Sequence, residues 1–338
     1  MQPSDQNVDQ NVINSIICNG LRIGSWNINQ VLIKCSDTIK TNDSDVYDII
    51  SEHDIFFISE AKLDPDLEDL VKIDGYESFY KSRNKKKNAK MYYGGIIVYI
   101  RKIYYDTKFI TLVEDLSTSE MIWLKINFEL GLTNHNTTDM FVGGVYVCPK
   151  KSTFNNIDDD GTGIYDELTT KIKELTELGN VICLGDFNSH TGNRDDFLRH
   201  DKIKGQEHLH DTNYVSDIVL PTRANQDEVS DQDGYGEKLL DLCKSTGLRL
   251  LNGRTLGDIN GSLTFYPKQH NKRPSVIDYC AVSQDIIRDV VSFKVLRHIP
   301  DISDHSAISA NILFPNPIEL PTHDAPVSYT HLTLPTKA

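Results

Sequence analysis

Several polar residues that could take part in catalysis stand in or directly beside apolar segments of the chain. In chain order they are Asn27, Asn29, Glu60, Asp186, Asn188, Asp278, Asp304 and His305. Burying one unpaired carboxylate is costly, but several at neighbouring strand ends become tolerable when they share a divalent cation. Hard oxygen ligands of this kind suit Mg²⁺, which keeps part of its water shell and binds substrate phosphates. A histidine next to an aspartate adds a candidate base, and a second aspartate could orient its ring.

Each of these residues also has a simple structural explanation when it is taken alone. Glu60 could be a solvated strand end, and the letters GDFN around Asp186 and Asn188 could form an ordinary turn. His305 could be a hydrogen-bonded surface histidine. The catalytic interpretation therefore depends on the whole ordered set.

Apolar segments of the length of β-strands recur along most of the chain. They cover 21–28, 54–59, 95–100, 121–128, 140–147, 181–184, 248–251, 263–266, 275–283, 290–296 and 307–313. Continuous runs of this kind are typical of strands buried on both faces. Apolar residues at helical spacing also predict two helices, one ending before Gly179 and one ending at Gly247. Helices interleaved with so many strands favour two packed sheets with helices outside.

The balance of charge argues against a general polyanion binder. The 338 residues include 35 Lys and Arg against 49 Asp and Glu, a formal net charge of −14. Hydrophobic residues make up 39% and charged residues 25%, as in soluble globular proteins. Any chemistry on phosphates must then depend on a bound metal or on a local basic surface. The segment Lys81–Lys90 is the candidate for such a surface.

Targeting and redox features point to the inside of the cell. The polar, acidic start resembles no signal peptide, and no apolar run approaches the roughly 20 residues that a membrane helix needs. The 6 cysteines form no CxxC pair and mostly have apolar neighbours. We therefore expect a soluble intracellular protein, nuclear or cytoplasmic, that has no membrane partner.

Six motifs, in this order, carry a family resemblance. They are SWNIN, ISEAKLD, GGVYVCP, LGDFNSH, SVIDY and SDH, and the resemblance that they carry spans roughly Leu21 to Leu313. The set resembles the endonuclease/exonuclease/phosphatase superfamily. The resemblance implies a four-layer α/β sandwich, in which two packed mixed β-sheets are flanked by helices. One domain over 20–314 is then expected, with a surface insertion at about 191–236 and tails at 1–19 and 315–338.

The resemblance also implies a role for each matched residue. The positions near the metal are Asn27, Asn29, Glu60 and Asp304, with Glu60 as the principal Mg²⁺ ligand and Mn²⁺ as an alternative ion. Tyr146 matches a contact to the scissile phosphate, and Asp186 and Asn188 match the pair that positions the attacking water. Asp278 matches the carboxylate that orients His305. Some members carry Asp where Asn29 stands, so the metal site here has one formal charge fewer. Whether Asp186 or His305 is the general base stays open.

Three longer stretches are similar to the endonuclease domains of non-LTR retrotransposons. They read GDFNSHTG, YGEKLLDLCKSTGLRLLNGR and SVIDY. This similarity implies nicking of DNA. The chain has no YxDD polymerase motif, and Pro326–Ala338 resembles translated library-adapter sequence, so a downstream reverse transcriptase is expected to be missing. The alternatives are an abasic-site or 3′-end DNA repair nuclease and a catalytically silent module that binds nucleic acid or protein.

The basic segment Lys81–Lys90 has two interpretations. It could contact the DNA backbone beside the active face through Arg83, Lys85, Lys86 and Lys87. It could equally be the solvated tip of a charged hairpin.

Overall fold

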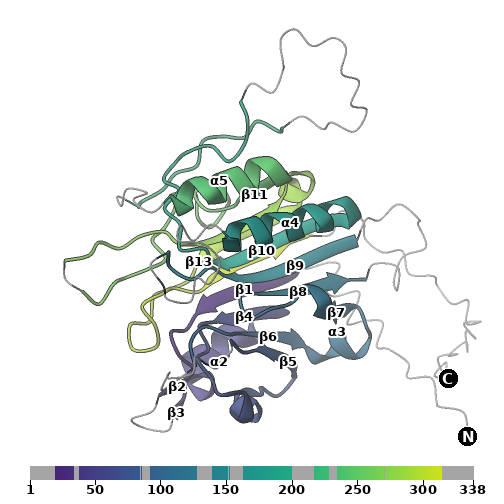
Figure 1. Cartoon of the computed structure of the whole chain (residues 1–338), viewed down its shortest axis with the longest axis vertical. Helices are drawn as coiled ribbons and strands as arrows, with labels where there is room; N and C mark the ends of the chain where they lie inside the picture. The colour runs from purple at the N-terminus through teal and green to yellow at the C-terminus, as the bar shows by residue number, and fades with distance from the viewer. Residues whose placement is uncertain are drawn as a thin grey trace, which may run out of the picture.

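The computed structural model places two six-stranded mixed sheets face to face with helices outside, which confirms the predicted α/β sandwich (Figure 1). It describes residues 20–33, 38–83, 85, 92–127, 139–150, 152, 163–199, 217–227, 234–269 and 271–313. The predicted tails, 1–19 and 315–338, lie outside the described residues. In the described part of the chain, no helix is long and apolar enough to cross a membrane.

The first sheet has the strand order β13-β14-β1-β4-β6-β5. Its central strand β1 (Leu21–Asn27) runs parallel to β4 (Ile55–Ser59) and antiparallel to β14 (Ile308–Ile312). The other strands are β5 (Tyr76–Lys81), β6 (Ile96–Arg101) and β13 (Val290–Val295). Because β1 and β4 are parallel, the residues that follow them meet at one edge of the sheet.

The second sheet has the strand order β11-β12-β10-β9-β8-β7. Strand β9 (Asp139–Tyr146) runs parallel to β10 (Gly179–Asp186), which pairs antiparallel with β12 (Asp278–Ser283). The other strands are β7 (Ile110–Leu112), β8 (Met121–Ile126) and β11 (Leu248–Leu250). A separate small ladder joins β2 (Leu32–Ile33) to β3 (Thr38–Ile39).

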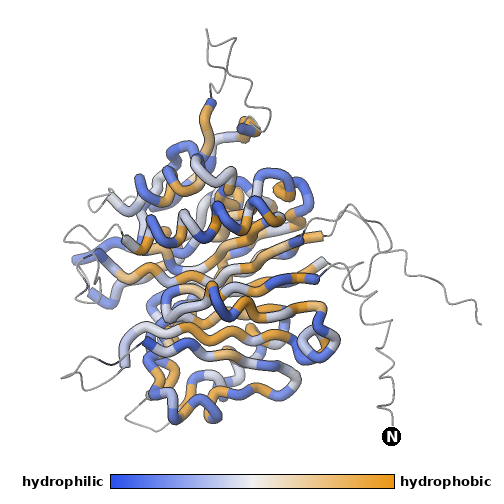
Figure 2. Tube along the Cα trace, turned by 45° about the vertical axis from the view of Figure 1, so that its right-hand side comes forward, coloured by the Kyte–Doolittle hydropathy of each residue, from blue (hydrophilic) through white to orange (hydrophobic). Residues whose placement is uncertain are grey.

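The main hydrophobic core lies between the two sheets. Side chains such as Ile23 and Phe57 from the first sheet meet Val142 and Leu184 from the second. The sheets approach closely at Gly144, where a Cβ atom would stand 2.1 Å from the Phe57 ring. Figure 2 shows mostly hydrophobic residues along the strands in the middle of the molecule. Along the helices, hydrophobic residues alternate with hydrophilic ones. This pattern is expected when strands are covered on both faces and helices on one.

Helices cover the outer face of each sheet. Helices α4 (Gly163–Leu178) and α5 (Tyr235–Thr246) pack on the second sheet, and α2 (Ser44–Ser51) packs on the first. The remaining helical segments are α3 (Lys102–Asp106), η1 (Lys40–Asn42), η2 (Pro65–Val71), η3 (Glu114–Leu116) and η5 (Gln284–Asp289). Both predicted helices are therefore confirmed, with their ends at the predicted glycines.

Two predicted strands differ from the structure. Residues 263–266 form no strand, because Phe265 makes only isolated bridges to Ser275 and His305. Residues 275–277 precede β12 instead of belonging to it, so Asp278 is the first residue of that strand. The backbones of Phe265 and Ser275 bond to each other, so the two segments are joined at a single bridge instead of along a ladder.

The described part of the polar segment 191–236 contains buried charged residues. Asp196 and Arg223 are buried, and ion pairs join the buried Asp196 to Arg254 and the buried Arg249 to Asp217. The prediction from composition missed these contacts, because charged residues enter a protein interior only with specific partners.

Candidate active site

The ends of five strands gather the predicted catalytic residues at one edge of the sandwich. Asn27 ends β1 beside Ser59 of β4, so Glu60 lies directly beyond it. In the second sheet, Asp186 is paired with Tyr146 on one side and with Asp278 on the other. Parallel pairs align the carboxyl ends of their strands, and the antiparallel β12 begins where β10 ends. The register of each sheet therefore places these side chains together.

Hydrogen bonds across the sandwich join the two groups. The Tyr146 hydroxyl donates to Glu60 Oε1 at 2.8 Å, and Asn27 Nδ2 donates to Asp186 Oδ2 at 2.9 Å and to Glu60 Oε1 at 3.2 Å. Asn27 and Tyr146 are both buried. The two sheets thus contribute to a single polar cluster.

The turns that carry this cluster have unusual backbone conformations. Asn29, Glu60 and Asn188 have φ angles of 48°, 51° and 47°, in the left-handed region. Asparagine tolerates this region, but glutamate rarely adopts it, at a cost on the order of 1–3 kcal/mol. The backbone at Glu60 is therefore held by the surrounding structure in a conformation that the residue does not prefer.

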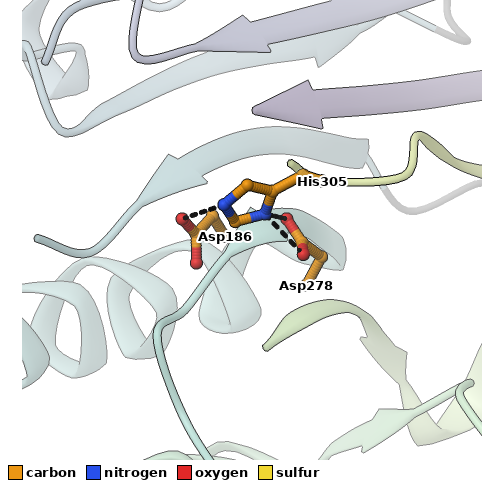
Figure 3. Close-up of side chains that lie close together, drawn as sticks. All are labelled: Asp186, Asp278 and His305. Carbon is orange, nitrogen blue, oxygen red and sulfur yellow. Dashed lines mark hydrogen bonds and ion pairs between the residues drawn. The ribbon is translucent and has the colours of Figure 1, made fainter. Parts of the chain in front are cut away.

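His305 lies between two aspartates (Figure 3). Its Nδ1 atom is 2.9 Å from Asp278 Oδ2 and 3.2 Å from Asp278 Oδ1, and its Nε2 atom is 4.0 Å from Asp186 Oδ2. All three residues are buried. Because a carboxylate accepts at Nδ1, that nitrogen carries a proton, and Nε2 faces Asp186.

The electrostatics of these three residues are coupled. Burial raises the pKa of Asp186, and the negative charge of Asp278 raises it further. Burial opposes the charged form of His305, but Asp278 outweighs it through its charge and hydrogen bond, so the pKa of His305 is raised. The raised pKa of Asp186 makes its carboxylate a stronger base. The raised pKa of His305 keeps its imidazole cationic near neutral pH.

The predicted metal-side residues are also brought together. Lys62 Nζ lies 2.5 Å from Glu60 Oε2 and donates to Asn29 Oδ1 at 2.7 Å, and Asn29 Nδ2 donates to Asp304 Oδ1 at 3.1 Å. Burial opposes ionisation of Glu60, yet Lys62 and the hydrogen bonds from Tyr146 and Asn27 hold its pKa below the usual value. An ionised, partly buried carboxylate with oxygen-bearing neighbours fits a hard divalent cation.

A second set of atoms also has the spacing of a metal site. Ligand atoms of Asp186, Asp278 and His305 all lie within 4.8 Å of one another. In this set, the Nδ1 proton of His305 points at Asp278, and Nε2 faces Asp186. A hydrogen bond and an ion pair join these three residues, and the predicted metal-side residues Asn27, Asn29, Glu60 and Asp304 lie beside them.

The predicted nucleic-acid contacts are only partly described. The Arg83 guanidinium lies 5.8 Å from the centre of the Tyr146 ring and pairs with Glu120 at 2.7 Å. Lys85 is exposed, and its Nζ lies 5.1 Å from the centre of the Tyr92 ring. Lys86 and Lys87 lie outside the described residues. The structure thus brings Arg83 to the edge of the site.

Two lysines of the site were missed from sequence. Lys62 follows Glu60 by two residues in ISEAKLD, so its motif was a usable signal. Lys40 is buried and donates from Nζ to the carbonyl oxygens of Ile28 at 2.6 Å, Asn29 at 3.2 Å and Ile302 at 2.5 Å. No local pattern marks Lys40, because Ile302 is 262 residues away.

The chain thus combines a two-sheet α/β sandwich with an acidic, histidine-containing cluster at the strand ends. A model of the Endonuclease/Exonuclease/phosphatase family matches residues 24–305. The chain belongs to this family. No curated protein is significantly similar to it in sequence.

Solved structures with low sequence identity share the fold. The AP endonuclease LMAP from Leishmania major is 15% identical, with a TM-score of 0.61 over 92% of this chain and 97% of its own. The 3′-5′ exonuclease NExo from Neisseria meningitidis is 16% identical, with a TM-score of 0.52 over 87% and 100%. The endonuclease domain of TRAS1, a telomere-specific non-LTR retrotransposon, is 12% identical, with a TM-score of 0.50 over 88% and 100%.

Proposed function

We propose that the protein is a Mg²⁺-dependent DNA endonuclease of the retrotransposon type, which nicks a strand by in-line attack of water on a phosphodiester. The observation that carries this proposal is the buried group formed by Asp186, His305 and Asp278, joined through Asn27 to Glu60. Such a group combines a base, a cation and a metal-binding carboxylate around one point. Motifs shared with retrotransposon endonuclease domains favour DNA nicking within the family.

The side chains divide the chemistry between them. Asp186 is the candidate base for the attacking water, and Asn188 Nδ2 donates to Asp186 Oδ2 at 3.2 Å and keeps that carboxylate in place. His305, held cationic by Asp278, offers Nε2 to the negative charge that develops on phosphorus in the transition state. The Tyr146 hydroxyl fixes Glu60 and stands beside the place for the phosphate.

The charge of the cluster supports a divalent cation. Glu60, Asp186, Asp278 and Asp304 are four acidic residues, against the three cations Lys40, Lys62 and His305. A phosphodiester adds another negative charge. Glu60, with Asn27, Asn29 and Asp304, would hold Mg²⁺ or Mn²⁺, which would polarise the phosphate oxygens when bound.

Nicking of supercoiled plasmid tests the function. We expect conversion to open circles with Mg²⁺, none in EDTA, and a loss of about 10²–10⁴-fold in rate for Glu60→Ala and for His305→Ala. Lys173→Ala is the matched control, because Lys173 is exposed and lies near the C-terminal end of α4. That end leads into the start of β10, whereas Asp186 is at the other end of β10. Equal nicking by the two site variants and the wild type would reject the proposal.

A repair nuclease is the second candidate, supported by the fold shared with LMAP, an AP endonuclease, and with NExo, a 3′ phosphatase solved with a product DNA hairpin. An abasic duplex and an intact duplex of the same sequence, cleaved side by side, distinguish the two candidates. A retrotransposon-type endonuclease should cut both at comparable rates, and a repair nuclease should cut the abasic duplex much faster.

A further inference from the structure

A second histidine–carboxylate pair lies beside the proposed active site. His190 Nδ1 is 2.8 Å from Asp227 Oδ2, and the same oxygen accepts from the backbone amide of Val276 at 3.2 Å. The Asp227 side chain is 0% exposed, whereas that of His190 is 23% exposed. The pair therefore has a buried acidic end and an open imidazole end.

The backbone places this pair next to the catalytic carboxylates. His190 follows Asn188 by two residues, and Val276 precedes Asp278 by two residues. The two segments are joined by a hydrogen bond from the Phe187 amide to the Ile277 carbonyl at 2.9 Å. The pair thus lies on the same edge of the second sheet as the Asp186–Asp278 register pair.

His190 is also held firmly. Its carbonyl oxygen accepts a hydrogen bond from Arg194 Nη2 at 3.1 Å. The same oxygen packs against Gly236, where an added Cβ atom would lie 2.1 Å from it. With the main chain fixed from one side and Nδ1 fixed by Asp227, the ring has a defined orientation.

The pair joins a buried carboxylate to an imidazole that reaches the surface. A fully buried carboxylate is costly unless a positive charge or several hydrogen bonds compensate it, and Asp227 has His190 as its ion-pair partner. With Nδ1 directed at Asp227, Nε2 is the ring nitrogen left to contact a ligand, and within the described ranges it has no hydrogen-bond partner. A ring that carries protons on both nitrogens donates from Nε2 to an anion while the Asp227 carboxylate balances its charge.

A purely structural role explains the pair less well. The segment that carries Asp227 is already attached by its backbone, since the Ala224 amide donates to Gly253 at 2.8 Å and the Gln226 amide donates to Gly261 at 2.9 Å. An ion pair with one partly exposed member adds little to such an anchor.

We propose that His190, oriented by Asp227, binds a backbone phosphate of the nucleic acid that flanks the scissile phosphate. The proposal rests on the proposed nuclease function, because it requires a polynucleotide in the site. Its position outside the Asp186–His305–Asp278 group makes His190 a substrate-binding residue and not part of the acid–base machinery. A protonated imidazole suits a phosphate oxygen, because charge-assisted hydrogen bonds are the stronger ones.

Equilibrium binding of a fluorescent DNA duplex tests the proposal, with His305→Ala as the parent so that Mg²⁺ can be present without cleavage. The dissociation constant is measured over a series of salt concentrations for the parent and for the parent carrying His190→Ala. We expect several-fold weaker binding and a slope of log K against log salt that is smaller by about 1, as for loss of one phosphate contact. Adding Lys173→Ala to the parent removes one positive charge elsewhere and should leave the slope unchanged.

Two further measurements keep the outcomes distinct. Adding Asp227→Asn to the parent should reproduce most of the loss in affinity, and thermal unfolding shows that each variant is folded. An unchanged slope and affinity for His190→Ala, with plasmid nicking by the wild type intact, would overturn this inference alone. Failure of the parent to bind any duplex, together with no nicking by the wild type, would overturn both it and the proposed function.

Discussion

At the residue scale, the raised pKa of His305 has a consequence for the pH dependence of the reaction. Asp278 keeps the imidazole protonated to higher pH than a free histidine. In Asp278→Asn the negative charge of Asp278 is lost and the pKa of His305 falls. The imidazole therefore loses its proton at a lower pH than in the wild type. We expect the alkaline limb of the kcat/KM profile for nicking to move to lower pH in this variant.

The pH profile of nicking also tests whether His305 acts as a cation or as the general base. If His305 acts as a cation, activity falls on the alkaline side. Lys173→Ala is the control and should show the same alkaline limb as the wild type. An alkaline limb at the same pH in Asp278→Asn and in the wild type would contradict the assigned role of Asp278.

At the scale of elements, Lys40 joins two segments that carry site residues. As the first residue of η1, it binds the carbonyls of Ile28 and Asn29, after β1, and of Ile302, before Asp304. Lys40→Met leaves these carbonyls unpaired and should lower the free energy of unfolding by about 2 kcal/mol. Because Asn29 and Asp304 lose their support, half-maximal nicking should also need more Mg²⁺.

Urea unfolding and Mg²⁺ titration of nicking measure these two effects. Lys102→Met is the matched control, because Lys102 is exposed and the change should alter stability by less than about 0.5 kcal/mol. Wild-type Mg²⁺ dependence in Lys40→Met would show that Lys40 contributes to stability alone.

The contact between β9 and β4 gives a second prediction at this scale. A methyl group at Gly144 would overlap the Phe57 ring, so Gly144→Ala should destabilise the protein by about 1–3 kcal/mol. Adding Phe57→Leu should recover part of this loss, because the two residues are in contact and their effects are coupled. Chemical unfolding of both single variants and the double variant measures the coupling, and strictly additive losses would argue against a direct clash.

At the scale of the whole molecule, His53 makes stability depend on pH. It is buried, with Nδ1 bonded to the Ile49 carbonyl at 2.7 Å and Nε2 to Ser309 Oγ at 2.8 Å, so the neutral ring donates at Nδ1 and accepts at Nε2. Burial lowers the pKa of His53 from 6.5 to about 4. Between these values the unfolded chain binds a proton that the folded protein does not, so stability falls as pH falls from 6.5 towards 4.

The expected contribution of His53 is about 3 kcal/mol at the acidic end of this range. His53→Asn keeps one donor and one acceptor but does not titrate, so its free energy of unfolding should depend less steeply on pH there. Urea unfolding at a series of pH values compares the two slopes. Parallel curves for the variant and the wild type would assign the pH dependence to other groups.

Much of the fold could be predicted because local patterns encode it. Runs such as Ile55–Ser59 are apolar at every position and become strands buried on both faces, and the spacing of Leu168 and Ile172 predicts α4. The strand β5, Tyr76–Lys81, was missed because its residues are only half-buried and mix polar with apolar side chains. Residues 263–266 were wrongly predicted as a strand, because Leu263, Phe265 and Tyr266 are only half-buried and Phe265 makes isolated bridges instead of a ladder.

The members of the candidate site were predicted, and their interactions were not. Residue type and position at strand ends pointed to Glu60, Asp186, Asp278 and His305, since those features are written along the chain. The pairing of His190 with Asp227, the three carbonyls bound by Lys40 and the raised pKa of Asp186 depend on contacts between distant segments. Only the tertiary structure decides them, because burial and distance, which set the strength of every charge interaction, exist only after these segments have come together.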